Sequence, residues 1–189
     1  VLHSTDSLRS QEKTPGSRYP GKMKVQNRCM RPKMKVQNRC MRPDRWNPQV
    51  DEQWCLIHAT HMTDEETRRM ARSGAVAGLC PVTEANLGDG PFNGSEFLSE
   101  AGRFGVGSDS NVRISLVEEL RTLEYSQRLR DLARNVMVPG EGSVGETLYT
   151  GAARGGAQAL GRGRGEIAVG AWADLTAIDS QDPALCALR

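Results

Sequence analysis

The chain has 189 residues, the length of one ordinary domain, and a formal net charge of only +2. An apolar content of 38% and an aromatic content of 5% are low for a single well-filled core, so part of the chain is expected not to pack. The charge shows which part, because residues 1–50 carry a net charge of +9 and residues 51–189 a net charge of −7.

Two broad classes of protein are excluded by composition. The chain has no run of about 18 apolar residues and no signal segment, which argues against a membrane protein. Its cysteines are odd in number and form no C-x-x-C pair, which favours reduced thiols over a disulfide framework. They are Cys29, Cys40, Cys55, Cys80 and Cys186. We expect a soluble, cytoplasmic protein with no membrane partner.

Residues 1–48 are predicted to be a disordered basic leader. They contain the 11-residue sequence KMKVQNRCMRP twice in tandem, at residues 22–32 and 33–43. Two identical copies indicate a duplication rather than a repeat fold, which needs about three or more units. A basic arm that binds polyanions is the alternative, although neither copy holds an aromatic residue for base stacking, so nucleic acid is an unfavoured partner.

The first βα unit follows the leader. Residues 55–57 are apolar and predict a short buried strand that ends at His58. Thr63 and Glu66 have the spacing of a capping box, and acidic residues precede basic ones along residues 64–73. Gly74 then supplies a helix stop. We expect a helix over residues 64–73.

Two more units follow in residues 75–135. The apolar run 75–80 predicts a second strand, which we expect to break at Pro81 into a loop before a short helix at 95–100. Residues 104–107 predict a third strand that ends just before Asp109. A second capping-box pattern begins a helix expected to reach residue 135.

In the last part of the chain, the spacing of apolar residues changes from that of a helix to that of strands. A further helix is expected from Ser143 to Gly161, and residues 166–170 and 173–179 read as two short strands. Strand and helix alternate three times before that, which predicts an α/β fold with a parallel sheet or barrel segment. We expect residues 49–162 to form this segment and residues 163–189 a separate small sheet.

Polar side chains follow each predicted strand and mark a candidate site. Imidazole and carboxylate groups at strand ends can converge on one rim and bind a divalent metal. The same residues also fit a core histidine, a helix-entry residue and an ordinary polar loop. The candidates are His58, His61, Thr83, Glu84, Asn86, Asp89 and Asp109.

Four motifs resemble the formimidoylglutamate deiminases of the amidohydrolase superfamily. They are WCLIHATHMTDEE, CPVTEANLGDGPF, RFGVGSDSNV and EELRTLEYSQRLR, followed by a tail, GEIAVGAWADLTAID, similar to the superfamily's return into a small β-sandwich. The resemblance implies a carboxyl-half fragment with the last three βα units of a TIM barrel and the start of the sandwich. It also implies zinc and the hydrolysis of N-formimino-L-glutamate to N-formyl-L-glutamate and ammonia, in histidine catabolism.

The resemblance assigns two roles and leaves others vacant. His58 would polarise the substrate or steady the metal-bound hydroxide, and Asp109 would bind zinc and carry a proton. Glu84, Asn86 and Asp89 are candidates for contact with substrate. The family's other three zinc ligands have no match, because His3 is the only histidine besides His58 and His61. We therefore expect weak or no activity from this chain by itself.

Three questions stay open at this point. HATH and GSDS do not fix the substrate, so another amidine or a purine-like ring is an alternative. A non-catalytic fragment with a polyanion-binding arm is a second alternative. An unclosed barrel also exposes a sheet edge, which makes a homo-oligomer a further expectation.

Overall fold

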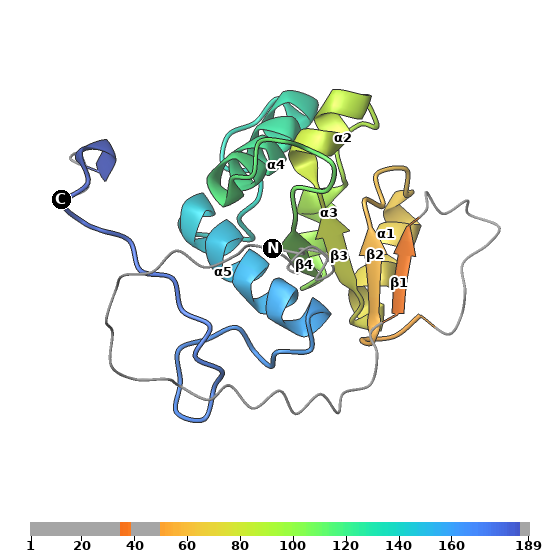
Figure 1. Ribbon diagram of the computed structural model, residues 1–189. Coiled ribbons are helices and arrows are strands. Elements are labelled where there is room, and N and C mark those ends of the chain that lie inside the picture. The colour runs from red at the N-terminus through yellow and green to blue at the C-terminus, as the bar shows by residue number, and fades with distance from the viewer. Residues whose placement is uncertain (1–34, 39–49, 186–189) are drawn as a thin grey trace.

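The computed structural model describes residues 35–38 and 50–185 (Figure 1). The rest of the predicted leader, including the first copy of the tandem repeat, lies outside the described residues. The same holds for three of the cysteines, which are Cys29, Cys40 and Cys186.

Four parallel strands form one sheet in the order β1-β2-β3-β4. Their bounds are β1 Lys35–Asn38, β2 Trp54–Ile57, β3 Val76–Leu79 and β4 Arg103–Val106. The predicted α/β fold with a parallel sheet is confirmed, and β2, β3 and β4 lie within about one residue of the predicted strands.

Strand β1 corrects the prediction of a wholly disordered leader. It comes from the second copy of the repeat and pairs with β2, with Lys35 opposite Trp54 and Asn38 opposite Ile57. An open strand edge offers backbone N–H and C=O groups, and these pair with an extended segment whatever its hydrophobic pattern. The sequence pattern therefore gave no signal for this strand.

Helix α1, Asp64–Ser73, confirms the prediction at both ends. Thr63 accepts a hydrogen bond from the Glu66 amide, and the Glu66 carboxylate accepts one from the Thr63 amide at 2.9 Å. Gly74 ends the helix with φ +77°, the left-handed conformation that glycine adopts without a steric penalty.

Helix α2, Pro81–Leu87, replaces the loop predicted after Pro81. The prediction was wrong because proline was read as a break. At the first position of a helix, proline costs no hydrogen bond and its fixed φ is already helical. Helix α3, Gly94–Ser99, follows close to its predicted place.

The two long helices are α4, Leu116–Asp131, and α5, Val144–Ala159. The hydroxyls of Ser115 and Ser143 cap them by accepting hydrogen bonds from the amides three residues later. Helix α4 ends four residues before its predicted end, since Leu132 turns left-handed with φ +52°.

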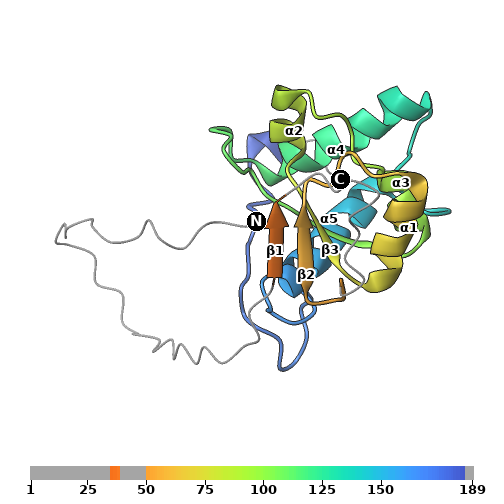
Figure 2. The same ribbon diagram turned by 90° about the vertical axis from the view of Figure 1, so that its right-hand side faces the viewer.

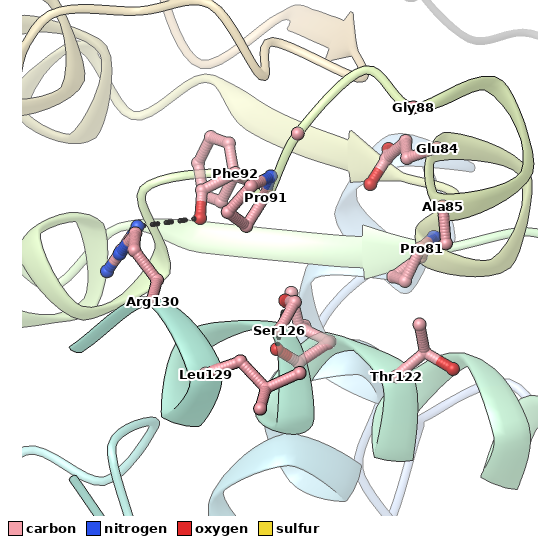
Figure 3. A pocket seen from close by; sticks show the side chains of 12 residues that line it. Pro81, Glu84, Ala85, Gly88, Pro91, Phe92, Thr122, Ser126, Leu129 and Arg130 are labelled. Carbon is pink, nitrogen blue, oxygen red and sulfur yellow. Dashed lines mark hydrogen bonds between the residues drawn. The ribbon is translucent and has the colours of Figure 1, made fainter. Parts of the chain in front are cut away.

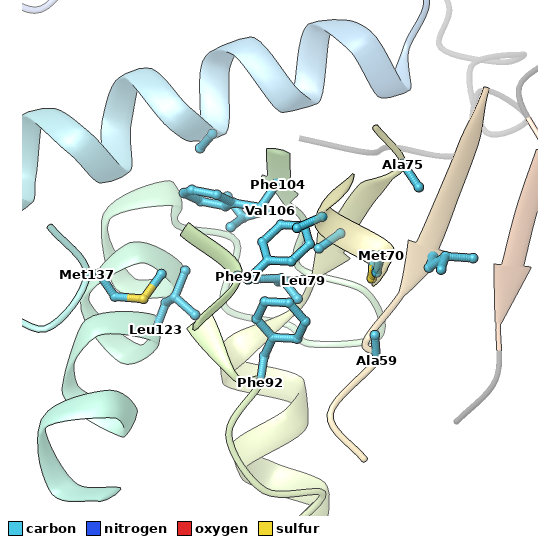
Figure 4. Close-up of a cluster of buried hydrophobic side chains, with 14 of the residues drawn as sticks. Ala59, Met70, Ala75, Leu79, Phe92, Phe97, Phe104, Val106, Leu123 and Met137 are labelled. Carbon is cyan, nitrogen blue, oxygen red and sulfur yellow. The ribbon is translucent and has the colours of Figure 1, made fainter. Parts of the chain in front are cut away.

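The main core lies between one face of the sheet and the helices (Figure 4). Side chains alternate along β3, so that Ala77 and Leu79 face this core while Val76 faces a second, smaller cluster. The largest buried side chains of the main core are Phe92, Phe97, Phe104, Met70, Leu79, Leu123 and Met137. Phe92 and Phe97 meet edge to face with ring centroids 5.2 Å apart.

Helix α5 lies directly against β4 (Figure 1), and in the view of Figure 2 it runs behind the sheet. Leu148 and Ala152 join the main core, whereas Ala159 joins the smaller cluster, so the helix runs from one face of the sheet to the other. Glycine makes this approach possible: a Cβ added to Gly105 of β4 would lie 3.1 Å from the backbone of Gly156.

The predicted sandwich segment is not observed. Within the described residues after 160, no strand forms, and residues 166–183 are exposed. Single short strands are not stable in water without a partner, and no described segment pairs with them. Among the described helices, none has the length and apolar character needed to cross a bilayer.

Candidate functional site

His58 and Asp109 meet at the carboxyl ends of two strands. His58 follows β2 and Asp109 follows β4, with β3 between them. Their side chains converge, because Nε2 of His58 lies 3.8 Å from Oδ2 of Asp109. The imidazole is partly buried at 24% exposure and the carboxylate is more open at 43%. Parallel strands therefore bring together two residues that are 51 positions apart in the sequence.

Glu84 completes the cluster from helix α2. Its Oε1 lies 3.2 Å from Nδ1 of His58 and accepts the amide hydrogen of Cys80 at 2.8 Å. The Glu84 side chain is only 5% exposed, and this burial raises the pKa of its carboxyl group. The Cys80 amide and His58 lower that pKa and offset part of the shift.

The backbone of the cluster is strained. His58, Ala59 and Asp109 have φ values of +66°, +50° and +49°, in the left-handed region that residues with a Cβ rarely adopt. Each such residue costs about 1–2 kcal/mol. Strain of this kind gathers at functional sites, where the surrounding structure holds it in place. Its coincidence with the converging side chains supports a site here.

The other candidates are not brought into this cluster. His61 and Asn86 are exposed, and Asp89 contributes a backbone hydrogen bond to Glu84 O that closes the turn after α2. Thr83 is buried and donates its hydroxyl hydrogen to the carbonyl of Ser108 at 3.0 Å. Thr83 therefore joins α2 to the segment that carries Asp109 and is a structural residue.

Glu119 is a buried carboxylate that the sequence did not single out. Its Oε2 accepts the amide hydrogen of Val82 at 2.9 Å, and its Oε1 has no hydrogen-bond partner. Burial raises the pKa of this carboxyl group too. Two carboxylates, Glu84 and Glu119, thus hold the first turn of α2. In the sequence, the one signal for this role was that Glu119 is an acidic residue on the inward face of a predicted helix.

A zinc ion does not fit the described residues as a complete site. Catalytic zinc typically takes three protein ligands. In the described part of the chain, no three His, Cys, Asp or Glu side chains are placed to hold a metal ion, and this includes His58, Glu84 and Asp109. Cys80 is near, but burial raises the pKa of its thiol to about 12, and zinc binds the thiolate. The Asp109 carboxylate is 43% exposed and is open to a ligand from outside the described residues.

A separate pocket opens beside the cluster, between α2 and α4 (Figure 3). Its volume is about 570 Å³ and its walls are mainly apolar. Glu84 is in its lining, whereas neither His58 nor Asp109 is. Arg130 lies at one end, where it hydrogen-bonds the carbonyl of Phe92 at 3.2 Å. The pocket is thus next to the cluster and distinct from it.

Comparisons with known proteins show which family the sequence is similar to. Residues 47–188 match the Amidohydrolase family. The chain is 57% identical over 140 residues to formimidoylglutamate deiminase of Pseudomonas aeruginosa, covering 74% of this chain and 31% of that protein. It is 30% identical over 140 residues to 5-methylthioadenosine/S-adenosylhomocysteine deaminase of Natronomonas pharaonis, covering 72% of this chain and 31% of that protein.

Solved structures agree on the fold. An amidohydrolase from Brucella melitensis is 64% identical, with a TM-score of 0.59 over 60% of this chain and 25% of that chain. An adenosine deaminase from Xanthomonas campestris with bound zinc has a TM-score of 0.64 at 24% identity, over 74% of this chain and 31% of that chain. The predicted TIM-barrel type of fold is confirmed. The chain spans 31% of the length of the first curated relatives.

Proposed function

The chain belongs to the amidohydrolase family, and from that premise we propose that it carries the carboxyl-terminal part of an amidine-hydrolysing site of the formimidoylglutamate deiminase type. The proposed substrate is N-formimino-L-glutamate, which would be converted to N-formyl-L-glutamate and ammonia. The identity of 57% to a protein of that name supports this choice over the adenosine-type deaminases, which are about 30% identical.

The observation that carries the proposal is the 3.8 Å gap between Nε2 of His58 and Oδ2 of Asp109. This separation is too long for a hydrogen bond, yet a third polar atom between them can contact both at about 2.8 Å. That atom can be a nitrogen of the amidine or the oxygen of the attacking water. Asp109 would take a proton from the water and pass it to the departing nitrogen, while His58 would contact the substrate's polar atom.

Zinc enters the proposal through one residue of this chain. Asp109 would be one metal ligand, and the remaining ligands would come from outside the described residues. A metal supplies, in such sites, a water that ionises near neutral pH. The proposal gives this chain a share of an active site, so we expect little or no ammonia release from the chain by itself.

A chimera tests the proposal. Residues 47–188 of this chain would replace the matching 31% of the Pseudomonas aeruginosa deiminase, and ammonia release from N-formimino-L-glutamate would be measured. We expect activity in the chimera and its loss, by at least about 100-fold, in His58→Gln and Asp109→Asn. The exposed His61→Gln is the matched control and should retain activity. An active chimera that tolerates both site substitutions would refute the proposal.

The same chimera separates the alternatives. Turnover of 5-methylthioadenosine with none of N-formimino-L-glutamate would favour the adenosine-type reading. An inactive chimera that is folded and binds zinc would show that this segment does not support the reaction. The basic arm is absent from the chimera, so its polyanion binding is tested separately, by salt-dependent retention of the whole chain on DNA or anionic lipid.

A further inference from the structure

We propose that Glu84 is a positioning residue that holds neutral His58 as the Nδ1–H tautomer and so leaves Nε2 without a proton on the side of Asp109. A neutral imidazole carries one proton, and the hydrogen bond made by one nitrogen decides the role of the other. His58 lies between two carboxylates, and their geometries differ enough to decide which of them receives that proton.

The distances favour Glu84. Its Oε1 is 3.2 Å from Nδ1, close enough for a hydrogen bond, whereas Asp109 Oδ2 is 3.8 Å from Nε2 and outside that range. Burial favours it as well, because the Glu84 side chain is 5% exposed and the Asp109 side chain 43% exposed. A hydrogen bond to a buried carboxylate is less screened by water than one to an open carboxylate.

Glu84 is itself held in place. The same oxygen that faces His58 accepts the Cys80 amide hydrogen at 2.8 Å, so one side of Oε1 is occupied by a fixed backbone donor. The helix that carries Glu84 is tied down twice more, through Thr83 to the carbonyl of Ser108 and through Val82 to Glu119. The acceptor thus meets His58 in one orientation, as positioning requires.

The bare Nε2 has a consequence for the site. An unprotonated ring nitrogen can accept a hydrogen bond or a proton, whereas an Nε2–H group can only donate. Glu84 would therefore set which of these roles His58 offers to the atom between it and Asp109. Only this catalytic consequence rests on the proposed function; the tautomer itself is a property of the folded chain.

The test is ¹⁵N NMR of the whole chain with labelled histidine. The chain has three histidines, and His58→Gln identifies the signals of residue 58. At a pH where the ring is neutral, we expect its Nδ1 to show the shift of a protonated nitrogen and Nε2 that of a bare one. In Glu84→Gln, the ratio of Nδ1–H to Nε2–H tautomers should fall about tenfold, the step expected when an ionised acceptor becomes neutral.

Glu119→Gln is the matched control. It neutralises the other buried carboxylate that holds α2 and does not touch His58, so the tautomer ratio should stay unchanged. A wild-type chain with mainly Nε2–H, or a Glu84→Gln variant with the wild-type ratio, would overturn the proposal. The wild-type spectrum decides the question even where Glu84→Gln fails to fold.

Kinetics in the chimera give a second readout. Glu84→Gln there should lower kcat by at least about tenfold with little change in KM, and Glu119→Gln should leave both near wild type. Equal effects of the two substitutions would indicate a structural role and would overturn the proposal. An inactive chimera would count against the proposed function alone, since the NMR result does not depend on turnover.

Discussion

The close contact between α5 and β4 predicts opposite effects for the same substitution at two adjacent glycines. A Cβ added at Gly155 would lie 2.8 Å from the Phe104 backbone nitrogen and nearer still to its carbonyl group. A Cβ added at Gly156 would have no atom within 4 Å. Both glycines lie inside the same helix, so their alanine variants share the same gain in helix propensity.

The magnitudes follow from this geometry. Alanine is favoured over glycine inside a helix by about 1 kcal/mol, so Gly156→Ala should stabilise the fold by up to that amount. Gly155→Ala must push α5 away from β4, because the atoms it meets are backbone and cannot rotate aside. Overpacking of this kind costs about 1–3 kcal/mol and sometimes more. Because the obstacle is rigid, we expect the upper end of that range, which after the gain of about 1 kcal/mol leaves a net loss of about 2 kcal/mol.

Urea denaturation followed by far-UV circular dichroism measures both effects. With an m-value of about 1–3 kcal/mol/M, the midpoint of Gly155→Ala should fall by about 0.7–2 M and that of Gly156→Ala should rise slightly. Equal m-values for the three chains would show that the midpoints report stability. A Gly155→Ala midpoint at or above wild type would refute the description of α5 as packed backbone to backbone on β4.

Three further predictions concern other parts of the fold. Leu132→Gly should raise the stability of the fold by roughly 1 kcal/mol in a thermal melt, since Leu132 has a left-handed backbone and is 91% exposed. Leu129→Gly, inside α4, should lower stability by a similar amount. The reverse order of the two variants would contradict the assigned end of α4. Glu124→Ala should cost about 3 kcal/mol in urea, because its carboxylate accepts the amide hydrogens of Val136 and Met137, and a loss below about 1 kcal/mol would contradict those bonds. Burial raises the pKa of Glu119, so its protonated form favours the folded state, and this contribution is lost as pH rises above the ordinary carboxyl range. Glu119→Gln should therefore gain stability relative to wild type as pH rises through and above that range, and a pH-independent difference would count against this.

The elements that could be predicted from the sequence are those encoded by residues close together in the chain. Helix α1 has its cap, its charge gradient and its glycine stop within twelve consecutive residues, and the prediction matches the observed bounds. The strand ends that place His58 and Asp109 were also found, because a short apolar run followed by polar residues is visible in the chain itself. Helix α2 was not predicted because Pro81 can either break a helix or begin one, and the sequence alone did not distinguish the two.

Features that depend on distant partners were not predictable. Strand β1 exists through its pairing with β2, and the predicted tail strands fail to form because nothing described pairs with them. Glu84 was placed among candidates for substrate contact, yet the structure buries it against a histidine 26 positions away. Neither the spacing of apolar residues nor a sequence motif predicts a contact between residues so far apart. The assignment of residues 49–162 and 163–189 to separate domains stays a prediction.

The order of the strands in the sheet is the order in which they are synthesised. Each strand neighbours the one made just before it, so a nascent chain can extend the sheet as residues leave the ribosome, without waiting for a later strand. Helix α5 is made after these four strands. Its Gln158 donates to the carbonyls of Glu52 and Gly74, both at 2.9 Å, and so joins positions 106 and 84 residues apart. Until Gln158 has left the ribosome, the four strands lack these two hydrogen bonds, which join α5 to segments made about 80–110 residues earlier.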